Sequence, residues 1–222
     1  MEIVSHQDYG SSVSSLHLVA AGGDYHDTVV SALACRRTLL DSALCNLIAH
    51  SSVLTEVAHL LVETLHSGRK VLVAGNGGSA AEAQHFAAEL VGRFKLDRSP
   101  YAVLALTTDT AILTAVANDY GYQEVFARQV RAFGQEDDLF IAFSTSGESD
   151  NLIQAARVGQ QRQMKVVAIT GDRPSHLGTL ANLTVRVPVV DTALAQELHM
   201  IVTHILCDIV ERRLVAYEGE GL

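Results

Sequence analysis

The chain has 222 residues, of which 48% are hydrophobic and 18% charged, and its formal net charge is −9 at pH 7. This length suits one well-buried domain, and the share of apolar residues excludes a disordered chain. The acidic balance and the absence of a run of Lys and Arg argue against direct binding to nucleic acid.

A location in the cytoplasm is predicted from three further observations. Residues 1–6 lack the basic start of a secretory signal, and no long apolar block follows them. The longest apolar runs are far shorter than the roughly 20 residues that a membrane span needs, so we expect no contact with a membrane. Cys35, Cys45 and Cys207 are odd in number and show no CxxC spacing, so buried reduced thiols are expected in place of disulfides.

The chain begins with residues 1–24, which mix Ser, Gly and His without clear periodicity and are predicted to form an N-terminal extension. From Tyr25 the apolar residues recur at helical spacing and predict a pair of helices, the second of which ends at Gly68. Five short β-rich runs follow, at residues 71–74, 102–106, 139–143, 166–169 and 183–187. Helical patterns separate these runs, at residues 80–94, 111–116, 123–133, 151–162 and 175–181, and a last long helix is predicted over 194–215.

Continuous apolar strands that alternate with helices are typical of a parallel sheet covered on both faces. The sequence therefore predicts an α/β fold in which one domain, residues 25–222, holds a five-stranded parallel sheet flanked by helices, together with the N-terminal helical pair. In such sheets ligands bind at the carboxyl ends of the strands, so the chemistry is expected in the loops that follow them.

The loop after the first predicted strand, residues 75–79 (Gly-Asn-Gly-Gly-Ser), opens directly into a helix. Glycines let the backbone turn tightly and approach a ligand, and free N–H groups at a helix N-terminus favour an anion. Ser79 is a candidate helix cap and a candidate hydroxyl donor to such an anion. The alternative is a plain strand-to-helix turn, since the spacing matches neither a Walker motif nor a dinucleotide-binding motif.

The loop after the third predicted strand, residues 144–149 (Ser-Thr-Ser-Gly-Glu-Ser), also runs into a helix. It places four hydroxyl groups around one glycine, those of Ser144, Thr145, Ser146 and Ser149. A helix cap needs only one of these hydroxyls, whereas a phosphate accepts several hydrogen bonds. Two such loops at equivalent strand ends predict a site for a sugar phosphate or a similar anion.

Histidine, carboxylate and amide side chains form a second constellation. His85 and Glu89 are four residues apart, which places them on one helical face. The last helix carries four further polar candidates: Gln196, Glu197, His199 and His204. Singly, each is explained as a hydrogen-bonded or solvated side chain, but together an imidazole pair, an amide oxygen and a carboxylate suit a zinc site. Gln196 and His204 are about 12 Å apart along one straight helix, so both reach one ion only if the helix starts after Gln196 or if one ligand comes from another subunit.

Several blocks of the chain resemble the sugar isomerase (SIS) domain of the phosphoheptose isomerases. They cover about residues 25–215 in the family's order: Gly-Asn-Gly-Gly-Ser at 75–79, His-Phe-Ala-Ala-Glu-Leu at 85–90, Gly-Arg-Phe at 92–94, Ala-Asn-Asp-Tyr-Gly at 117–121, Ser-Thr-Ser-Gly at 144–147, Ala-Ile-Thr-Gly at 168–171, and Gln-Glu-Leu-His at 196–199 followed by His204. The resemblance implies a SIS domain and an aldose–ketose isomerase that interconverts D-sedoheptulose 7-phosphate and D-glycero-D-manno-heptose 7-phosphate. It also implies a homotetramer with active sites between subunits.

The resemblance further implies roles for individual residues. The implied zinc ligands are His85, Glu89, Gln196 and His204. The implied substrate-binding residues are Asn76, Gly77, Ser79, Ser144, Thr145, Ser146, Ser149 and Gln196, with Arg93 near the site. For an enediol reaction we expect Glu89 to act as the base and His204 as its acid partner. A bound zinc would lower the basicity of Glu89, so the roles of base and ligand compete.

Two alternatives and one departure from the family's pattern accompany this prediction. Much of the chain also resembles a non-catalytic sister group, the bacterial replication regulators that bind the initiator protein, but these carry serine and asparagine where this chain has Glu89 and His204. A sugar-phosphate sensor without turnover is the other alternative. Ala193 and Leu194 stand where the heptose isomerases typically have Asp and Arg, which leaves the sugar preference open.

Overall fold

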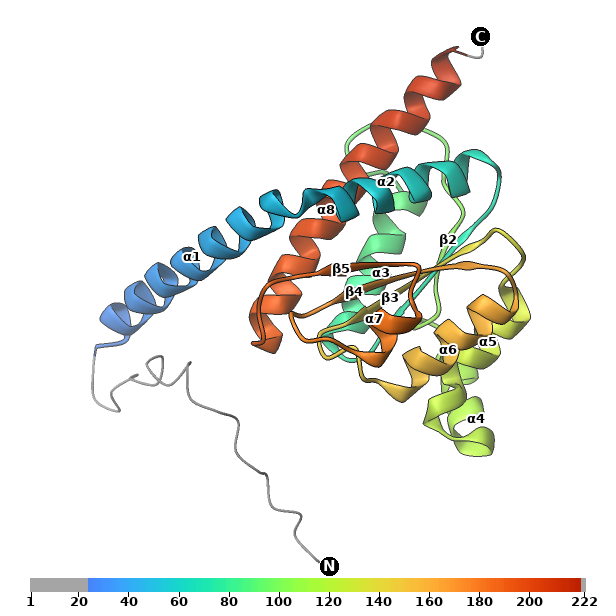
Figure 1. The fold of residues 1–222 in the computed structure, drawn as a ribbon, viewed down its shortest axis with the longest axis horizontal. Helices are drawn as coiled ribbons and strands as arrows, with labels where there is room; N and C mark the ends of the chain where they lie inside the picture. The colour runs from blue at the N-terminus through green and yellow to red at the C-terminus, as the bar shows by residue number, and fades with distance from the viewer. Residues whose placement is uncertain (1–23, 221–222) are drawn as a thin grey trace, which may run out of the picture. The chain divides into compact units, whose positions relative to one another are not determined.

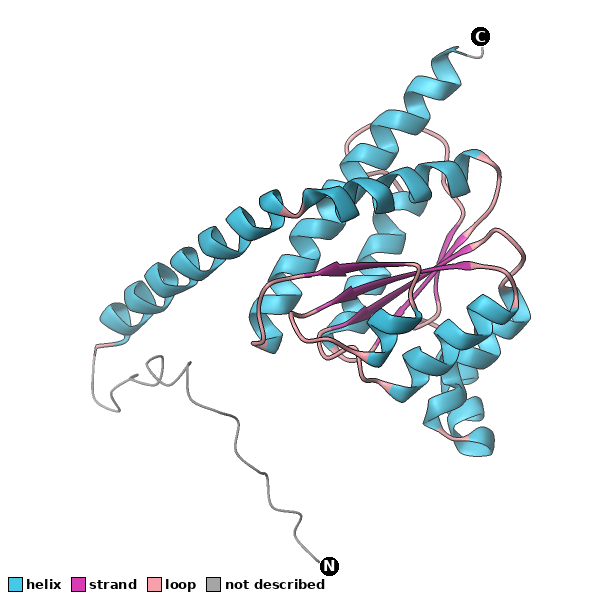
Figure 2. Cartoon of the chain, viewed as in Figure 1, coloured by secondary structure: helices cyan, strands magenta, loops and turns pink. Residues whose placement is uncertain are grey.

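Figures 1 and 2 show the computed structural model of the chain, which describes residues 24–220. The chain forms two compact units, divided after residue 41, and helix α1 (Tyr25–Ala49) runs across the division. The predicted helical pair is confirmed by α1 and α2 (Ser51–His66), and Gly68 adopts a φ of 73° after α2 as expected. The predicted extension, residues 1–24, lies outside the described residues except for its last residue. Three apolar side chains of the first unit are exposed: Val29, Val30 and Leu33.

All five predicted strands are confirmed, and they form one parallel sheet in the order β2-β1-β3-β4-β5. The strands are β1 (Val71–Gly75), β2 (Val103–Ala105), β3 (Leu139–Ser144), β4 (Lys165–Thr170) and β5 (Leu183–Arg186). Every residue of β1 and β3 is buried, because apolar side chains on both faces of these strands are covered by helices.

Helices pack on both faces of the sheet (Figure 2). The remaining helices are α3 (Gly78–Val91), α4 (Thr110–Tyr120), the 3₁₀ turn η1 (Tyr122–Glu124), α5 (Val125–Phe133), α6 (Asp150–Gln161), α7 (His176–Leu180) and α8 (Thr192–Glu220). Helices α2, α3 and α8 lie over one face, and α5, α6 and α7 lie over the other (Figure 1). The prediction of one α/β domain with a five-stranded parallel sheet is therefore confirmed.

Alternating strand positions pack against the two helical layers. Leu72 and Phe140 belong to a buried cluster with Phe126 of α5 and Leu152 of α6. On the opposite face, the ring centroid of Phe143 lies 6.3 Å from that of Phe86 on α3. This second layer, built by α3 and α8, is the one that carries the histidine and carboxylate candidates.

Two predicted helices differ from the structure for local reasons. The helix predicted over residues 123–133 is divided into η1 and α5, because Gly121, with a φ of 89°, ends α4 and the N–H of Glu124 bonds back to the Gly121 carbonyl. The helix predicted over 80–94 ends at Val91. The Arg98 guanidinium accounts for this end, because it donates to the carbonyls of Glu89 and Leu90.

Among the described helices, α8 is long and apolar enough to cross a membrane by length and composition, with a mean hydropathy of 1.3 over an 18-residue window within residues 192–217. Half of that window is buried inside the structure. Burial of this kind is the usual state of a core helix in a soluble domain, and α8 packs along α3 and α2.

Candidate active site

The two glycine- and hydroxyl-rich loops leave the sheet side by side. Strands β1 and β3 are hydrogen-bonded neighbours, and Gly75 pairs with Phe143 at their carboxyl ends. Asn76 and Ser144 follow these two residues, so both loops begin at the same edge of the sheet. The sequence-based expectation that the loops share one site is consistent with this register.

In the first loop, the prediction that Ser79 caps a helix is wrong. Helix α3 begins at Gly78, and its N-cap residue is Gly77, which has a φ of 57° and makes no side-chain cap. Because the positive φ at Gly77 lets the chain enter the helix early, Ser79 lies inside the first turn and is buried. Its backbone N–H bonds to the Asn76 carbonyl at 3.0 Å.

In the second loop, two hydroxyl oxygens accept hydrogen bonds from the loop's own backbone. Ser144 Oγ accepts from the N–H of Gly147 at 3.0 Å, and Ser146 Oγ accepts from the N–H of Glu148 at 3.2 Å. Each hydroxyl thereby keeps its hydrogen for another acceptor. The Thr145 carbonyl accepts from the N–H of Gly171, which ties the loop to the end of β4. Ser149 is the N-cap residue of α6 and makes no side-chain cap.

Glu148 holds this loop from the outside, a role that the sequence analysis did not predict. Its carboxylate accepts the backbone N–H of His176 at 2.9 Å and contacts Nδ1 of the same residue. These hydrogen bonds from His176 hold the pKa of Glu148 below its usual value. The N–H of Leu177 also bonds to the Gly147 carbonyl, so α7 supports the hydroxyl loop at two points.

His85, Glu89 and His204 come together at one place between α3 and α8. Nε2 of His85 lies 3.0 Å from Nε2 of His204 and 3.1 Å from Oε1 of Glu89. The side chains of His85 and Glu89 are 42% and 22% exposed, so a small molecule has access to them. The ring of Phe94 stacks on His204 at a centroid distance of 5.7 Å and a tilt of 24°, which fixes the plane of this imidazole.

This triad fits a zinc ion. One ligand atom from each of the three residues lies within 4.8 Å of the other two. Zinc binds nitrogen and oxygen at about 2.0–2.2 Å, so tetrahedral ligands are about 3.3 Å apart. The separations of 3.0 and 3.1 Å at His85 need only a small outward shift to match. Two imidazoles and one carboxylate are also a set that zinc prefers.

Gln196, the fourth predicted ligand, does not join the triad within this chain. Helix α8 is continuous from Thr192, so it does not start after Gln196, and the rise to His204 is about 12 Å. A side chain placed at Gly78 would collide with the Gln196 amide, which therefore packs against the start of α3. Within the chain, Gln196 faces the glycine loop, whereas His204 faces His85.

A buried pair of side chains, one from α3 and one from α8, lies between the Gln196 contact and the triad. Nδ1 of His199, which is fully buried, lies 3.4 Å from Oε2 of Glu82 on α3. His199 was one of the polar candidates on the last helix, and the structure places it in the core and not in the triad. Three contacts thus run along the two helices, from Gly78 and Gln196 through Glu82 and His199 to the triad.

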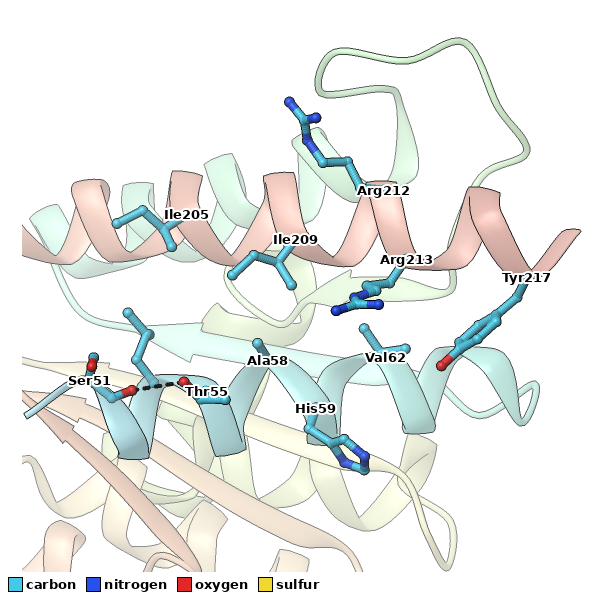
Figure 3. Close-up of a pocket in the computed structure, with 11 residues that line it drawn as sticks. Ser51, Thr55, Ala58, His59, Val62, Ile205, Ile209, Arg212, Arg213 and Tyr217 are labelled. Carbon is cyan, nitrogen blue, oxygen red and sulfur yellow. Dashed lines mark hydrogen bonds between the residues drawn. The ribbon is translucent and has the colours of Figure 1, made fainter. Parts of the chain in front are cut away.

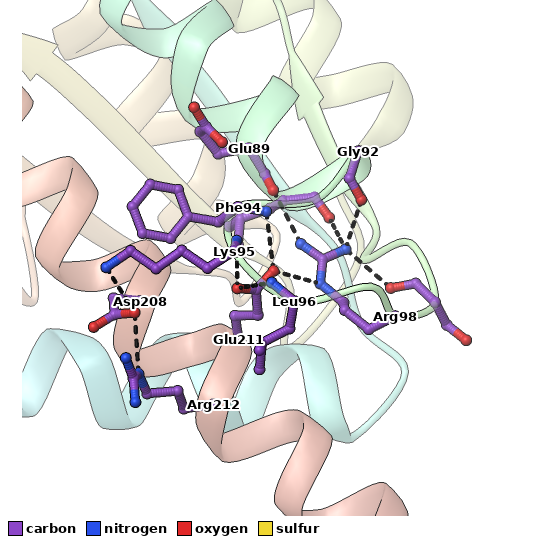
Figure 4. A network of polar contacts seen from close by, with 11 residues as sticks. Glu89, Gly92, Phe94, Lys95, Leu96, Arg98, Asp208, Glu211 and Arg212 are labelled. Atoms are coloured by element: carbon purple, nitrogen blue, oxygen red, sulfur yellow. Dashed lines mark hydrogen bonds and ion pairs between the residues drawn. The ribbon is translucent and has the colours of Figure 1, made fainter.

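A clamp of charged groups, which the sequence analysis missed, fixes the chain beyond the triad (Figure 4). The fully buried Glu211 carboxylate accepts the backbone N–H groups of Phe94, Lys95 and Leu96 at 2.7–2.9 Å and pairs with Nε of Arg98 at 3.3 Å. Burial alone would raise the pKa of Glu211, but the three N–H donors and the Arg98 charge lower it overall. The clamp thereby joins the end of α3 to α8.

Two other predicted positions are on the surface. Arg93 lies just after α3 and is exposed, whereas the Arg98 side chain bonds to the Glu89 carbonyl and pairs with Glu211. Ala193 is exposed in the first turn of α8, and Leu194, whose N–H bonds to the Asp191 carboxylate at 2.8 Å, is buried.

A separate apolar groove of about 710 Å³ runs between α2 and α8 (Figure 3). Its apolar lining includes Leu54, Ala58, Val62, Ile205 and Ile209. None of the predicted site residues lines this groove.

Comparison with known proteins places the chain among sugar isomerases. The SIS domain family model matches residues 43–171. A phosphoheptose isomerase of Helicobacter pylori strain P12 is 48% identical over 160 residues, 72% of this chain and 83% of the relative. The phosphoheptose isomerase of Aromatoleum aromaticum is 43% identical over 190 residues, 83% of this chain and 96% of the relative. The solved structure of a phosphoheptose isomerase from Neisseria gonorrhoeae is 36% identical, with a TM-score of 0.77, and the match covers 85% of this chain and all of that one.

Proposed function

Because the chain belongs to the phosphoheptose isomerase family of SIS-domain proteins, we propose that it interconverts D-sedoheptulose 7-phosphate and D-glycero-D-manno-heptose 7-phosphate in heptose biosynthesis. The resemblance seen in the sequence is thereby confirmed, and the chain is a sugar-phosphate isomerase. One observation carries the proposed reaction: the convergence of His85, Glu89 and His204 from two helices that are far apart in the sequence.

The reaction moves a proton between C1 and C2 through an enediol, so it needs a base at carbon and an acid at oxygen. Glu89 takes the proton from one carbon and returns it to the neighbouring carbon. His204 donates a proton to the carbonyl oxygen and recovers one from the hydroxyl that becomes the new carbonyl. The Phe94 ring supports this role, because stacking holds the His204 imidazole in one orientation.

His85, Glu89 and His204 are proposed to hold a zinc ion, with Gln196 as the fourth ligand. A bound zinc would polarise the carbonyl and hydroxyl oxygens of the substrate. Because α8 is continuous, the Gln196 ligand is assigned to a neighbouring subunit. Coordination lowers the basicity of a carboxylate, so Glu89 acts as a base only to the extent that it is free of the ion.

The two loops at the sheet edge are proposed to hold the phosphate and to position C1 and C2 at the triad. The residues assigned to substrate binding are Asn76, Gly77, Ser79, Arg93, Ser144, Thr145, Ser146, Ser149 and Gln196. The free hydroxyl hydrogens of Ser144 and Ser146 support this assignment, because both oxygens already accept a backbone N–H. Glu148 does not oppose an anion strongly, since its carboxylate is bound to His176.

The functional protein is proposed to be a cytoplasmic homotetramer with active sites between subunits, and its SIS domain to extend over residues 25–222. Uncovered apolar surface supports assembly: Val29, Val30 and Leu33 of α1 are exposed, and the groove between α2 and α8 is apolar. Sedimentation equilibrium of the full chain tests the tetramer, and a monomer at micromolar concentration would contradict it.

The function is tested by a turnover assay with D-sedoheptulose 7-phosphate, run with added zinc and again after chelation. Zinc-dependent formation of the heptose phosphate is expected, and Glu89→Gln is expected to abolish turnover while ligand binding survives. Glu63→Gln is the matched control, because Glu63 also lies four residues after a histidine, on the exposed face of α2. Full activity of Glu89→Gln would overturn the assignment of the base.

The alternatives predict other results in the same assay. Folded, zinc-loaded protein that binds the sugar phosphate without turnover would indicate a sensor. Protein that binds neither substrate nor product would direct the search first to other sugar phosphates and then to a binding partner such as a replication initiator. The presence of Glu89 and His204 in one cluster favours the enzyme over both alternatives.

A further inference from the structure

The side-chain amides of Asn76 and Asn151 form a reciprocal pair. Nδ2 of Asn76 donates to Oδ1 of Asn151 at 2.9 Å, and Nδ2 of Asn151 donates to Oδ1 of Asn76 at 2.9 Å. Asn76 lies in the loop after β1, and Asn151 lies in the first turn of α6, where it is 3% exposed. The pair therefore joins the first of the two loops that the proposed function assigns to phosphate to the helix that follows the second.

A third side chain completes the environment of Asn76. The phenol of Tyr122, in the 3₁₀ turn η1, donates to Oδ1 of Asn76 at 3.1 Å. Tyr122 is 58% exposed, so its ring is not held by a core. The hydroxyl contact with Asn76 is the polar bond that ties this residue to the loop.

The Asn76 amide has few hydrogen-bonding groups that remain unused. An amide oxygen has two lone pairs, and both are used here, one by Asn151 and one by Tyr122. An amide nitrogen has two hydrogens, and one of them is used by Asn151. The partly exposed Asn76 side chain therefore has one N–H group free and no free acceptor.

We propose that Asn151 and Tyr122 are positioning residues that hold the Asn76 amide so that it meets the ligand only as a hydrogen-bond donor. This inference rests on the proposed function, because it takes Asn76 as a residue that contacts the sugar phosphate. A free N–H suits the oxygen of a phosphate or of a sugar hydroxyl. An amide that rotated freely would turn its oxygen toward these same atoms half of the time, and that oxygen would repel a phosphate.

The test is a double-mutant cycle on the full chain, read from the affinity for D-sedoheptulose 7-phosphate in isothermal titration. Tyr122→Phe removes one bond to Asn76 and is expected to weaken binding about threefold to tenfold, whereas Asn151→Ala removes two and is expected to cost about tenfold or more. If both residues act through Asn76, neither change costs more than about twofold further in an Asn76→Ala background. Losses that multiply in that background would overturn the proposal.

Control variants separate the effect on Asn76 from other effects of the substitutions. Tyr120→Phe removes a hydroxyl two residues earlier in the chain, leaves the Asn76 bonds in place, and is expected to bind as the wild type does. Tyr122 is exposed and phenylalanine keeps its ring, so Tyr122→Phe is expected to fold. The comparison of Tyr122→Phe with and without Asn76→Ala can therefore be made even if Asn151→Ala does not fold. Wild-type protein that binds the sugar phosphate without turnover would overturn the proposed reaction and leave the cycle intact. Wild-type affinity in Tyr122→Phe, or no binding by the wild type, would overturn this inference.

Discussion

Nε2 of His85 and Nε2 of His204 lie 3.0 Å apart, although 119 positions separate the two residues in the chain. Two imidazole nitrogens at this distance share one hydrogen bond if one ring donates and the other accepts, and they repel each other if both rings are protonated. Glu89 approaches His85 on the same side, at 3.1 Å. A bound divalent cation would remove the competition for the shared hydrogen, because all three atoms would then act as electron-pair donors.

We expect the purified protein to carry zinc and His85→Ala to lose it, because only two of the three converging side chains, Glu89 and His204, remain. The measurement is metal content per chain by mass spectrometry after dialysis against a weak chelator. His59→Ala is the control, since His59 and Glu63 repeat the same spacing on α2, with a separation of 3.7 Å and no third ligand among the described residues. A full complement of zinc in His85→Ala would refute the triad as a metal site.

We also expect Glu211→Gln to destabilise the fold by about 3 kcal/mol, because the buried Arg98 guanidinium loses its counter-charge. Urea unfolding at pH 7 and fixed protein concentration measures this difference. Asp208→Asn, one turn earlier on α8, is the control. Its carboxylate pairs with Lys95 and Arg212 on the surface, so a much smaller change is expected. Equal losses in both variants would contradict a special role for the buried clamp.

The clamp also has a predicted pH dependence. Because the pKa of Glu211 is lower in the folded protein than in the unfolded chain, the carboxylate stabilises the fold fully at pH values above the unfolded pKa, about 4.3. This contribution is lost as the pH falls through the lower folded pKa. The stability difference between the wild type and Glu211→Gln is therefore expected to be constant from pH 6 to 7 and to shrink below about pH 4. A difference that grows on acidification would contradict the sign of the shift.

The fold was predictable because its signals are local. Runs such as residues 139–143 are apolar on both faces, so strand type and burial follow from a few consecutive residues. The loops at 75–79 and 144–149 were likewise found, because glycine and hydroxyl residues directly after a strand are a local pattern. The helix cap was misplaced, since the conformation of Gly77 and not the hydroxyl of Ser79 decides where α3 begins.

The connections between distant residues were not predictable from one sequence. Asn76 and Asn151 are 75 positions apart, and Glu211 contacts a loop more than 100 residues away. In the sequence, a buried Glu such as Glu211 cannot be distinguished from a solvated one, because the sequence gives the residue type and not its contacts in the fold. The pairing of His85 with His204 was inferred only through the family resemblance, since spacing alone left several polar residues of the last helix open.

Cys207 is expected to resist alkylation in the native protein. Burial, followed by the negative charges of Glu89 and Glu211, raises the pKa of its thiol to about 12. At pH 8 the reactive thiolate is then about 10³-fold scarcer than at an ordinary cysteine, before burial blocks access. Treatment with iodoacetamide and peptide mass spectrometry should find Cys45, which is exposed, modified and Cys207 intact until the chain is unfolded. Rapid native labelling of Cys207 would contradict the packing between α3 and α8.

The glycine loop allows a contrast between two substitutions that differ only in their surroundings. Gly77 has a φ of 57° and a ψ of −122°, which lie outside the left-handed helical region, but open space surrounds it, so Gly77→Ala is expected to cost about 2 kcal/mol of backbone strain. Gly75 is buried, and a methyl group there would collide with the backbone carbonyl of Ser79 in the first turn of α3. Since that backbone cannot move without breaking the turn, Gly75→Ala is expected to cost about 3 kcal/mol or more.

Urea unfolding of both alanine variants at one protein concentration measures the contrast. A larger loss of unfolding free energy in Gly75→Ala would indicate that the end of β1 must approach α3 closely. The same close approach places Asn76 near the hydroxyl loop. If the order were reversed, with Gly77→Ala the more damaging change, strain at the positive φ would dominate. The tight turn from β1 into α3 would then not depend on the absence of a side chain at Gly75.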